Sequence, residues 1–323
     1  MQNINSTNCN HSSDFQYSLY STTFIIIFVL GLLTNSIALW VLCSYKNKKN
    51  KAIIFMINLA FADLAHVLSL PLRIHYYIYY TWPFGRFMCL LCFYLKYLNM
   101  YASIFFLTAI SVQRYFFTTN PFKAKDWKRR YDVAISAVIW IIVGGACLPF
   151  PLLRNSGSSN NNNTCFADLG LIKPKVGPAM AMLTVAEMAG FIIPMTVIIY
   201  CTLKTKTQLK SEDQQCHNIT EKHKALRMVT TCAVVFFICF APYHINFFFY
   251  IMLQFKIIEH CGMYKFIMTL HPYTLCLASI NCCLDPILYF FTAKEFQNEA
   301  AKRGSTVMRG RLMSRESSSF VKE

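Results

Sequence analysis

The sequence is poor in charge. Charged residues make up 14% of its 323 residues and hydrophobic residues 55%, whereas a soluble globular protein carries about 25% charged residues. So few charges, separated by long apolar runs, exclude an ordinary chain of soluble domains. We also expect no cleavable signal peptide, because residues 1–17 are polar and contain no basic stretch followed by an apolar one. We therefore expect the first apolar run to serve as an uncleaved signal-anchor.

The usual motifs of catalysis and nucleic acid binding are missing as well. The sequence contains no HExxH, no paired Cys/His metal spacing and no serine nucleophile motif, so we predict no enzyme, no catalytic residue and no cofactor. The net charge of +16 could suggest nucleic acid binding, but no basic stripe is interleaved with aromatic residues. The two halves of the chain lack the internal symmetry of many transporters. A transporter is therefore the less favoured alternative.

Seven apolar runs are long enough to cross a membrane, since a spanning helix needs about 20 apolar residues. Only helices satisfy their own backbone groups in lipid, so the expected fold is all-α, a seven-transmembrane helix bundle. The expected spans are 20–45, 53–79, 87–118, 133–153, 178–203, 225–253 and 265–291. Prolines within these runs, which membrane helices tolerate, are expected to mark kinks. They are Pro71, Pro149, Pro194, Pro242 and Pro286.

Basic residues set the expected orientation. No Lys or Arg precedes Lys46, and most of the 31 lie in the segments that follow the first, third, fifth and seventh runs. Because basic residues favour the cytoplasmic side, the N-terminus should be extracellular in a multi-pass protein of the plasma membrane. Glycosylation sequons at Asn5, Asn10 and Asn162 all fall on the outer side, which agrees.

The expected organisation therefore has four parts. Residues 1–19 form an extracellular N-terminus and residues 20–291 the helix bundle. Residues 292–303 are amphipathic and are expected to lie on the inner membrane surface as a short helix. Residues 304–323 are a serine-rich cytoplasmic tail that we expect to be disordered. The tail is either merely solvated or a docking site that depends on phosphorylation.

Polar side chains inside the apolar runs form an ordered set. Such residues are costly in a membrane and indicate function. They lie in the motifs LLTN with Asn35, NLAFADL with Asp63, the third run with Asn99 and Ser103, and ASINCCLDPILYF with Asn281, Asp285 and Tyr289. With SVQRYFFTTNPF, Trp140 and FFICFAPYH, the series resembles the rhodopsin-like (class A) G-protein-coupled receptors. Segments such as KDWKRRYD and WPFGRFMCLLCFYLKYLNMYASI are most similar to the purinoceptor-like branch and, within it, to the lysophosphatidylserine receptors.

The resemblance implies a receptor that activates a heterotrimeric G protein, here of the 12/13 class that drives Rho signalling. It implies arrestin and receptor kinases as partners of the serine-rich tail. The residues to which it assigns coupling and activation are Arg114, Tyr115, Phe236, Phe240, Pro242 and Tyr289.

Two departures from the family's pattern concern activation. The family usually has an acidic residue where this chain has Gln113. The missing ion pair with Arg114 predicts some basal activity, unless other contacts compensate. Tyr200 stands two positions before the usual activation tyrosine, where this chain has Thr202, so the usual link to Tyr289 is in doubt.

The resemblance also implies two disulfides and a sodium site. It pairs Cys89 with Cys165, and Cys9 with Cys261, all at outer ends where oxidising conditions favour disulfides. The sodium site would be an oxygen cage, which a hard cation prefers. Its residues would be Asp63, Asn99, Ser103, Asn281 and Asp285. The alternative is a hydrogen-bonded core with water, although two carboxylates there are not both expected to ionise without a cation.

Cations in the outer halves of the runs predict an anionic ligand. Arg73, Lys96 and Arg154 share one sign and would attract a phosphate or carboxylate, although each could instead snorkel or form an internal ion pair. Glu187 could pair with Lys96 or Arg154. Further donors nearby are Tyr97, Tyr101, Tyr243 and His244. The resemblance implies lysophosphatidylserine as the ligand. An extracellular nucleotide is the alternative, but three cations are few for a di- or triphosphate.

Overall fold

The computed structural model describes residues 14–44, 53–149, 165–166, 176–211, 219–258 and 260–288. Within these ranges the regular structure is helical, without β-strands. The elements are α1 (Asp14–Ser44), α2 (Ile53–Tyr79), α3 (Gly85–Thr119), α4 (Pro121–Asp126), α5 (Arg129–Cys147), α7 (Val176–Glu187), the π-helical turn η2 (Met188–Ile192), α8 (Ile193–Ser211), α9 (Ile219–Cys239), α10 (Ala241–Gln254) and α11 (Cys261–Leu284).

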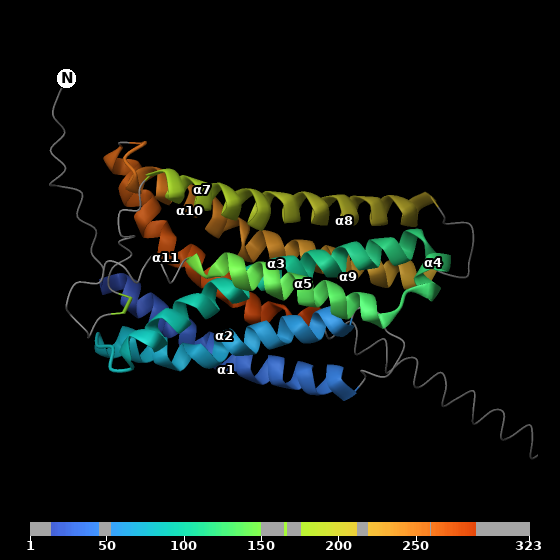
Figure 1. Ribbon diagram of the computed structural model, residues 1–323, viewed down its shortest axis with the longest axis horizontal. Coiled ribbons are helices and arrows are strands. Elements are labelled where there is room, and N and C mark those ends of the chain that lie inside the picture. Colours follow the sequence, from blue (N-terminus) through green and yellow to red (C-terminus); the bar gives the residue numbers. More distant parts are fainter. Residues whose placement is uncertain are drawn as a thin grey trace, which may run out of the picture.

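Among the described residues, seven helical rods, each a single helix or several helices in succession, are long and apolar enough to cross a membrane. The fifth rod combines α7, η2 and α8, and the sixth combines α9 and α10. Figure 1 shows them as an elongated bundle in which α3 runs through the middle. The central helix α3 packs against α2, α5, α8 and α9, while α1 packs against α2 and α11. The predicted seven-helix bundle is therefore confirmed.

Several helices extend beyond the predicted spans. The first begins at Asp14 rather than residue 20, and the fourth begins at Arg129 rather than residue 133. Hydropathy falls where a helix leaves the membrane, but backbone hydrogen bonding continues into water, so apolar runs underestimate these helices. The predicted end of the fourth span at residue 153 lies outside the described residues. The element α5 ends at Cys147 and the helix is interrupted at Leu148, because Pro149 disfavours a helical residue before it and supplies no backbone N–H.

The expected proline kinks are met in part. At Pro242 the sixth rod is interrupted between α9 and α10 at Phe240, and Pro194 is the second residue after the π-helical turn. Pro71 lies inside an uninterrupted α2. The helical conformation is also interrupted at Leu148, directly before the helical residue Pro149, which agrees with the kink predicted there. A proline that the prediction left out, Pro272, lies inside α11.

The bundle is apolar both inside and outside, as a membrane protein requires. Large side chains such as Phe106, Phe236 and Phe240 are fully buried in its centre. Others point outward, among them Trp40 with 73% of its surface exposed and Ile141 with 74%. Lipid solvates such outward side chains as well as a protein core does. The buried polar residues are therefore the exceptional ones, and they define the sites described next.

Candidate functional site

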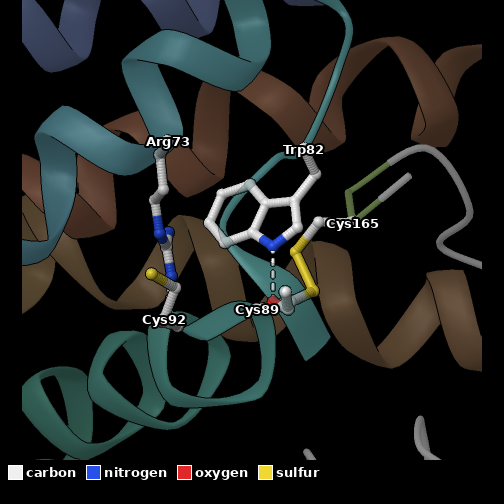
Figure 2. The surroundings of a disulfide bond; sticks show 6 residues. Arg73, Trp82, Cys89, Cys92 and Cys165 are labelled. Atoms are coloured by element: carbon white, nitrogen blue, oxygen red, sulfur yellow. Dashed lines mark hydrogen bonds between the residues drawn. A yellow bond between two sulfur atoms is a disulfide. The ribbon is translucent and has the colours of Figure 1, made fainter. Parts of the chain in front are cut away.

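A disulfide anchors one end of the bundle, the end predicted to face outside. Cys89 in the first turns of α3 is bonded to Cys165, which confirms that predicted pair. Trp82 lies beside the bond and donates its indole N–H to the carbonyl oxygen of Gly85 over 2.7 Å (Figure 2). Cys261 is also disulfide-bonded, but its predicted partner Cys9 lies outside the described residues. The anchored segment places Phe166 over the outer ends of α2 and α3.

Arg73 lies just beneath this anchored end. Its side chain crosses from α2 toward α3, where Nη2 donates to the carbonyl oxygen of Cys92 (Figure 2). The guanidinium lies 5.3 Å from the ring centroid of Phe166, and only 2% of the residue is exposed. Its Nε atom has no hydrogen-bond partner among the described residues. A buried cation that keeps an unused donor can bind an anion bidentately.

Lys96 brings a second cation to the same region. It lies on α3, with Nζ 5.3 Å from the ring centroid of Tyr97. It lies within electrostatic reach of His66 on α2 and of His271 on α11, and Arg73 also acts on His66. The two predicted cations therefore belong to one positive region between three helices. The third, Arg154, lies outside the described residues.

The remaining predicted ligand residues lie where α3, η2 and α10 meet. His244 stacks on Phe191 with ring centroids 4.7 Å apart, and Tyr101 approaches it edge-on at 5.9 Å. Tyr243, 1% exposed, is also part of this group. The close packing of this group requires glycine at position 190, since a Cβ there would lie 2.5 Å from the Tyr101 ring. These residues form a tightly packed aromatic wall.

Glu187 has a different partner from the one predicted. Its Oε1 lies 3.2 Å from Nδ1 of His244, whereas the sequence favoured Lys96 or Arg154. Glu187 directly precedes the π-helical turn η2. A π-helical turn contains one extra residue, so it changes the direction in which the preceding side chains point. Apolar periodicity does not show where such a turn occurs, which explains the difference.

The five residues of the predicted sodium site lie together in the middle of the bundle, each 0–3% exposed. Nδ2 of Asn99 donates to Oδ1 of Asp63 over 2.8 Å. Nδ2 of Asn281 donates to Oγ of Ser103 over 3.0 Å. Oδ2 of Asp63 and both carboxylate oxygens of Asp285 have no hydrogen-bond partner among the described residues. This is a group of buried oxygens that suits a hard cation.

Asn35 extends the polar core to the first helix. Its Nδ2 donates to the carbonyl oxygens of Cys282, over 2.7 Å, and of Gly31, over 3.0 Å. Its Oδ1 adds another buried oxygen without a hydrogen-bond partner in the described ranges. The core is thus built from α1, α2, α3 and α11, which holds these four helices in one arrangement.

At the opposite end of the bundle, Arg114 lies half-buried near the end of α3. It lies within electrostatic reach of Cys232 on α9. Next to it, Nε2 of Gln113 donates to Oδ1 of Asp132 on α5 over 2.7 Å. Gln113 therefore bonds to another helix, at the position where the family's usual acidic residue would pair with Arg114.

Tyr115 and Tyr200 form a second contact at this end. Their ring centroids lie 5.8 Å apart, and the hydroxyl of Thr202 bonds to the carbonyl oxygen of Ile198 in its own helix. Tyr200 thus meets α3 near the bundle surface, where 52% of it is exposed. Its expected partner in the family's usual link, Tyr289, lies outside the described residues, as do the sequons at Asn5, Asn10 and Asn162.

Several residues of these sites were not predicted. His66 follows Asp63 by one helical turn and is 1% exposed, and its position within NLAFADLAHVL was a usable signal. Phe166 directly follows Cys165, so its position beside the disulfide could also have been inferred. Gly190 and Asp132 gave no signal, because their roles depend on partners in other helices.

Comparison with known proteins identifies related chains. The family described as "7 transmembrane receptor (rhodopsin family)" matches residues 34–289. The putative purinoceptor 10 of Homo sapiens is 61% identical over 314 residues, which are 97% of this chain and 92% of that protein. "Probable G-protein coupled receptor 174" of Mus musculus is 45% identical, covering 90% of this chain and 88% of that protein. "Lysophosphatidic acid receptor 6" of Homo sapiens is 33% identical, covering 96% and 90%.

Proposed function

This chain belongs to the rhodopsin family of seven-transmembrane receptors, and on that premise we propose that it is a cell-surface receptor for an anionic lysophospholipid, lysophosphatidylserine. The family consists of G-protein-coupled receptors, which are not enzymes, and membership rules out the transporter alternative. What membership leaves open is the ligand, the class of G protein and the direction of the N-terminus.

The observation that carries the ligand proposal is the buried cation Arg73 together with Lys96, since both lie within electrostatic reach of His66. Two neighbouring cations suit one phosphodiester and one carboxylate, whereas a nucleotide di- or triphosphate brings more negative charge. One relative is named a lysophosphatidic acid receptor and another a purinoceptor, so relatives alone do not decide between lipid and nucleotide. Adjacent tyrosines, including Tyr97 and Tyr101, offer apolar surface and hydroxyl donors to either ligand.

Substitution of the two cations tests this proposal. Arg73→Ala and Lys96→Ala should each weaken the response to lysophosphatidylserine more than tenfold, which corresponds to about 1.4 kcal/mol or more. Arg73→Lys should restore the response only in part, because lysine cannot bind bidentately. Lys265→Ala removes a charge from the exposed outer end of α11 and is the matched control for general attraction. Surface staining shows whether each variant folds.

Responses to different ligands distinguish a lipid receptor from a nucleotide receptor. Shortening the acyl chain should weaken the response progressively, since each buried CH₂ contributes about 0.8 kcal/mol. A full response to ATP or UDP with none to the lysolipid would overturn the ligand, while leaving the receptor family untouched.

The polar core supports a second part of the proposal, a Na⁺ ion held by Asp63 and Asp285. Three oxygens of these carboxylates have no partner in the described part of the chain, and two buried carboxylates repel each other unless a cation or proton lies between them. Asn99, Ser103 and Asn281 supply further oxygens. One Na⁺ would balance one of the two negative charges and reduce the repulsion between the carboxylates.

We also propose that the coupled G protein is of the 12/13 class. Arg114 faces α9, and the interruption at Phe240 and Pro242 gives the sixth rod a place to bend, with Phe236 packed against Phe240. Outward movement of α9 would expose Arg114 to the G protein. Arg114→Ala should abolish nucleotide exchange with surface expression intact; exchange at normal strength would remove this role. An exchange assay across G-protein classes decides which class couples. Arrestin and receptor kinases are the partners proposed for residues 304–323.

The proposed orientation places the N-terminus outside. An epitope tag at the N-terminus should be stained on intact cells, and a tag after Glu323 only after permeabilisation. The opposite pattern would reverse the assignment of the Arg73 end as the outer one.

A further inference from the structure

One carboxylate oxygen joins three segments at the inner end of the bundle. Oδ1 of Asp132 on α5 accepts from Nε2 of Gln113 on α3 over 2.7 Å. It also accepts from Nε1 of Trp127, in the segment between α4 and α5, over 2.8 Å. Gln113 and Asp132 are 5% and 2% exposed. We call Gln113, Trp127 and Asp132 the inner network.

The chemistry of the inner network requires donors around the carboxylate. Burying a carboxylate is costly unless hydrogen bonds compensate for the lost water, and hydrogen bonds to a charged acceptor are the stronger kind. At position 113, glutamine supplies an N–H donor, whereas a glutamate of the same shape would place a second carboxylate against Asp132 and repel it. The identity of residue 113 is thus fixed by a residue on another helix.

The inner network also controls where α4 lies. The Trp127 ring packs against Phe116 and Phe117 of α3, with centroids 5.6 Å and 5.8 Å away. The helix α4, which ends directly before Trp127, presents Phe122 with 81% of its surface exposed. Arg114 directly follows Gln113. Asp132 therefore links the residue beside Arg114 to the segment that carries Phe122.

We propose that Asp132 is a positioning residue for G-protein engagement, which holds Arg114 and α4 in the relative placement that the G protein recognises. The proposal rests on the coupling part of the proposed function and is independent of the ligand.

Four receptors test the proposal: the wild type, Gln113→Glu, Asp132→Asn, and the double variant. Ligand-independent and lysophosphatidylserine-stimulated nucleotide exchange are measured with the heterotrimer that responds most strongly to the wild type. Gln113→Glu should lower exchange at least fivefold. Asp132→Asn should change it less than twofold, because an amide oxygen still accepts from both donors. The double variant should recover to within twofold of wild type, since the new asparagine N–H donates to the new glutamate.

The double variant separates this proposal from its main alternative. If a glutamate at 113 acted by holding Arg114 directly, the Asp132→Asn substitution would not relieve the loss. A double variant as poor as Gln113→Glu, or a Gln113→Glu receptor equal to wild type, would therefore overturn the positioning role. A wild type that activates no G protein would instead refute the coupling proposal itself.

Two further variants serve as a matched control and as a replacement for a variant that misfolds. Ser136 lies on the same helix, 4% exposed, and its hydroxyl bonds to the backbone carbonyl oxygen of Asp132 rather than to the carboxylate. Ser136→Ala is therefore the matched control and should leave exchange unchanged. If Gln113→Glu fails to reach the cell surface, Gln113→Met removes the donor without adding charge and should lower exchange two- to threefold. A Gln113→Met receptor with wild-type exchange would contradict the proposal.

Discussion

Carboxylates are buried at two depths of this bundle, and their surroundings differ. In the middle, Oδ2 of Asp63 and both carboxylate oxygens of Asp285 have no hydrogen-bond partner among the described residues. At the inner end, a single oxygen of Asp132 receives two donors from other segments. Burial is similar, since all three residues are 0–2% exposed.

The difference separates a carboxylate that is stabilised by protein donors from carboxylates that require a cation or a proton. Asp132 is stabilised by groups that belong to the protein, so its energy should not depend on ions in solution. Asp63 and Asp285 have too few protein donors for two negative charges, so their energy should depend on a cation or proton.

The largest effect is expected for Asp132→Ala. This substitution leaves the N–H groups of the buried Gln113 and the half-buried Trp127 without their acceptor, and the loss at a buried group costs about 1–3 kcal/mol. The midpoint of thermal unfolding in detergent should fall by several degrees. The fall should be the same in sodium chloride and in N-methyl-D-glucamine chloride of equal ionic strength. An unchanged midpoint, or a fall seen in only one salt, would show that the inner network does not stabilise the bundle independently of ions in solution.

The contrast also shows what could be predicted from the sequence. The seven spans follow from hydropathy because lipid leaves a spanning segment no alternative to a helix. The residues of the polar core could be grouped because each is a costly polar residue in an apolar run.

Pairings across helices could not be predicted in the same way. The bond between Gln113 and Asp132 depends on how α3 and α5 pack, and Asp132 lies beside a basic segment that looks solvated in sequence. The pair of Glu187 with His244 depends on a π-helical turn, which leaves no periodic signal. Helix existence is a local property, whereas these contacts depend on the relative rotation of two helices.

An intermediate effect is expected for Asp285→Asn. If Na⁺ binds the core, sodium should stabilise the wild type relative to N-methyl-D-glucamine, by about 1.4 kcal/mol when its concentration is tenfold above the dissociation constant. The variant should lose most of this gain, because one of the two carboxylates is gone. In the sodium-free salt it should be at least as stable as the wild type, since one buried charge fewer must be compensated. Thermal unfolding of both receptors across a sodium titration measures this.

The Asp132→Ala receptor is the control for that titration, because its carboxylate lies outside the core and it should keep the full response to sodium. Equal sodium responses of wild type and Asp285→Asn would leave a hydrogen-bonded core with water as the better description.

The smallest effect is expected for Trp127→Phe, and its value lies in comparison with Trp140→Phe. Both indoles are half-buried and each donates one hydrogen bond of 2.8 Å, Trp127 to the Asp132 carboxylate and Trp140 to the amide oxygen of Asn58. A bond to a charged acceptor contributes about 1.5–3 kcal/mol, and a neutral one about 0.5–1.5 kcal/mol. Phenylalanine keeps an aromatic ring at both sites, so Trp127→Phe should lower the unfolding midpoint more than Trp140→Phe. Equal losses would indicate that Asp132 is uncharged, and the contrast between the two depths would then lie in donor number alone.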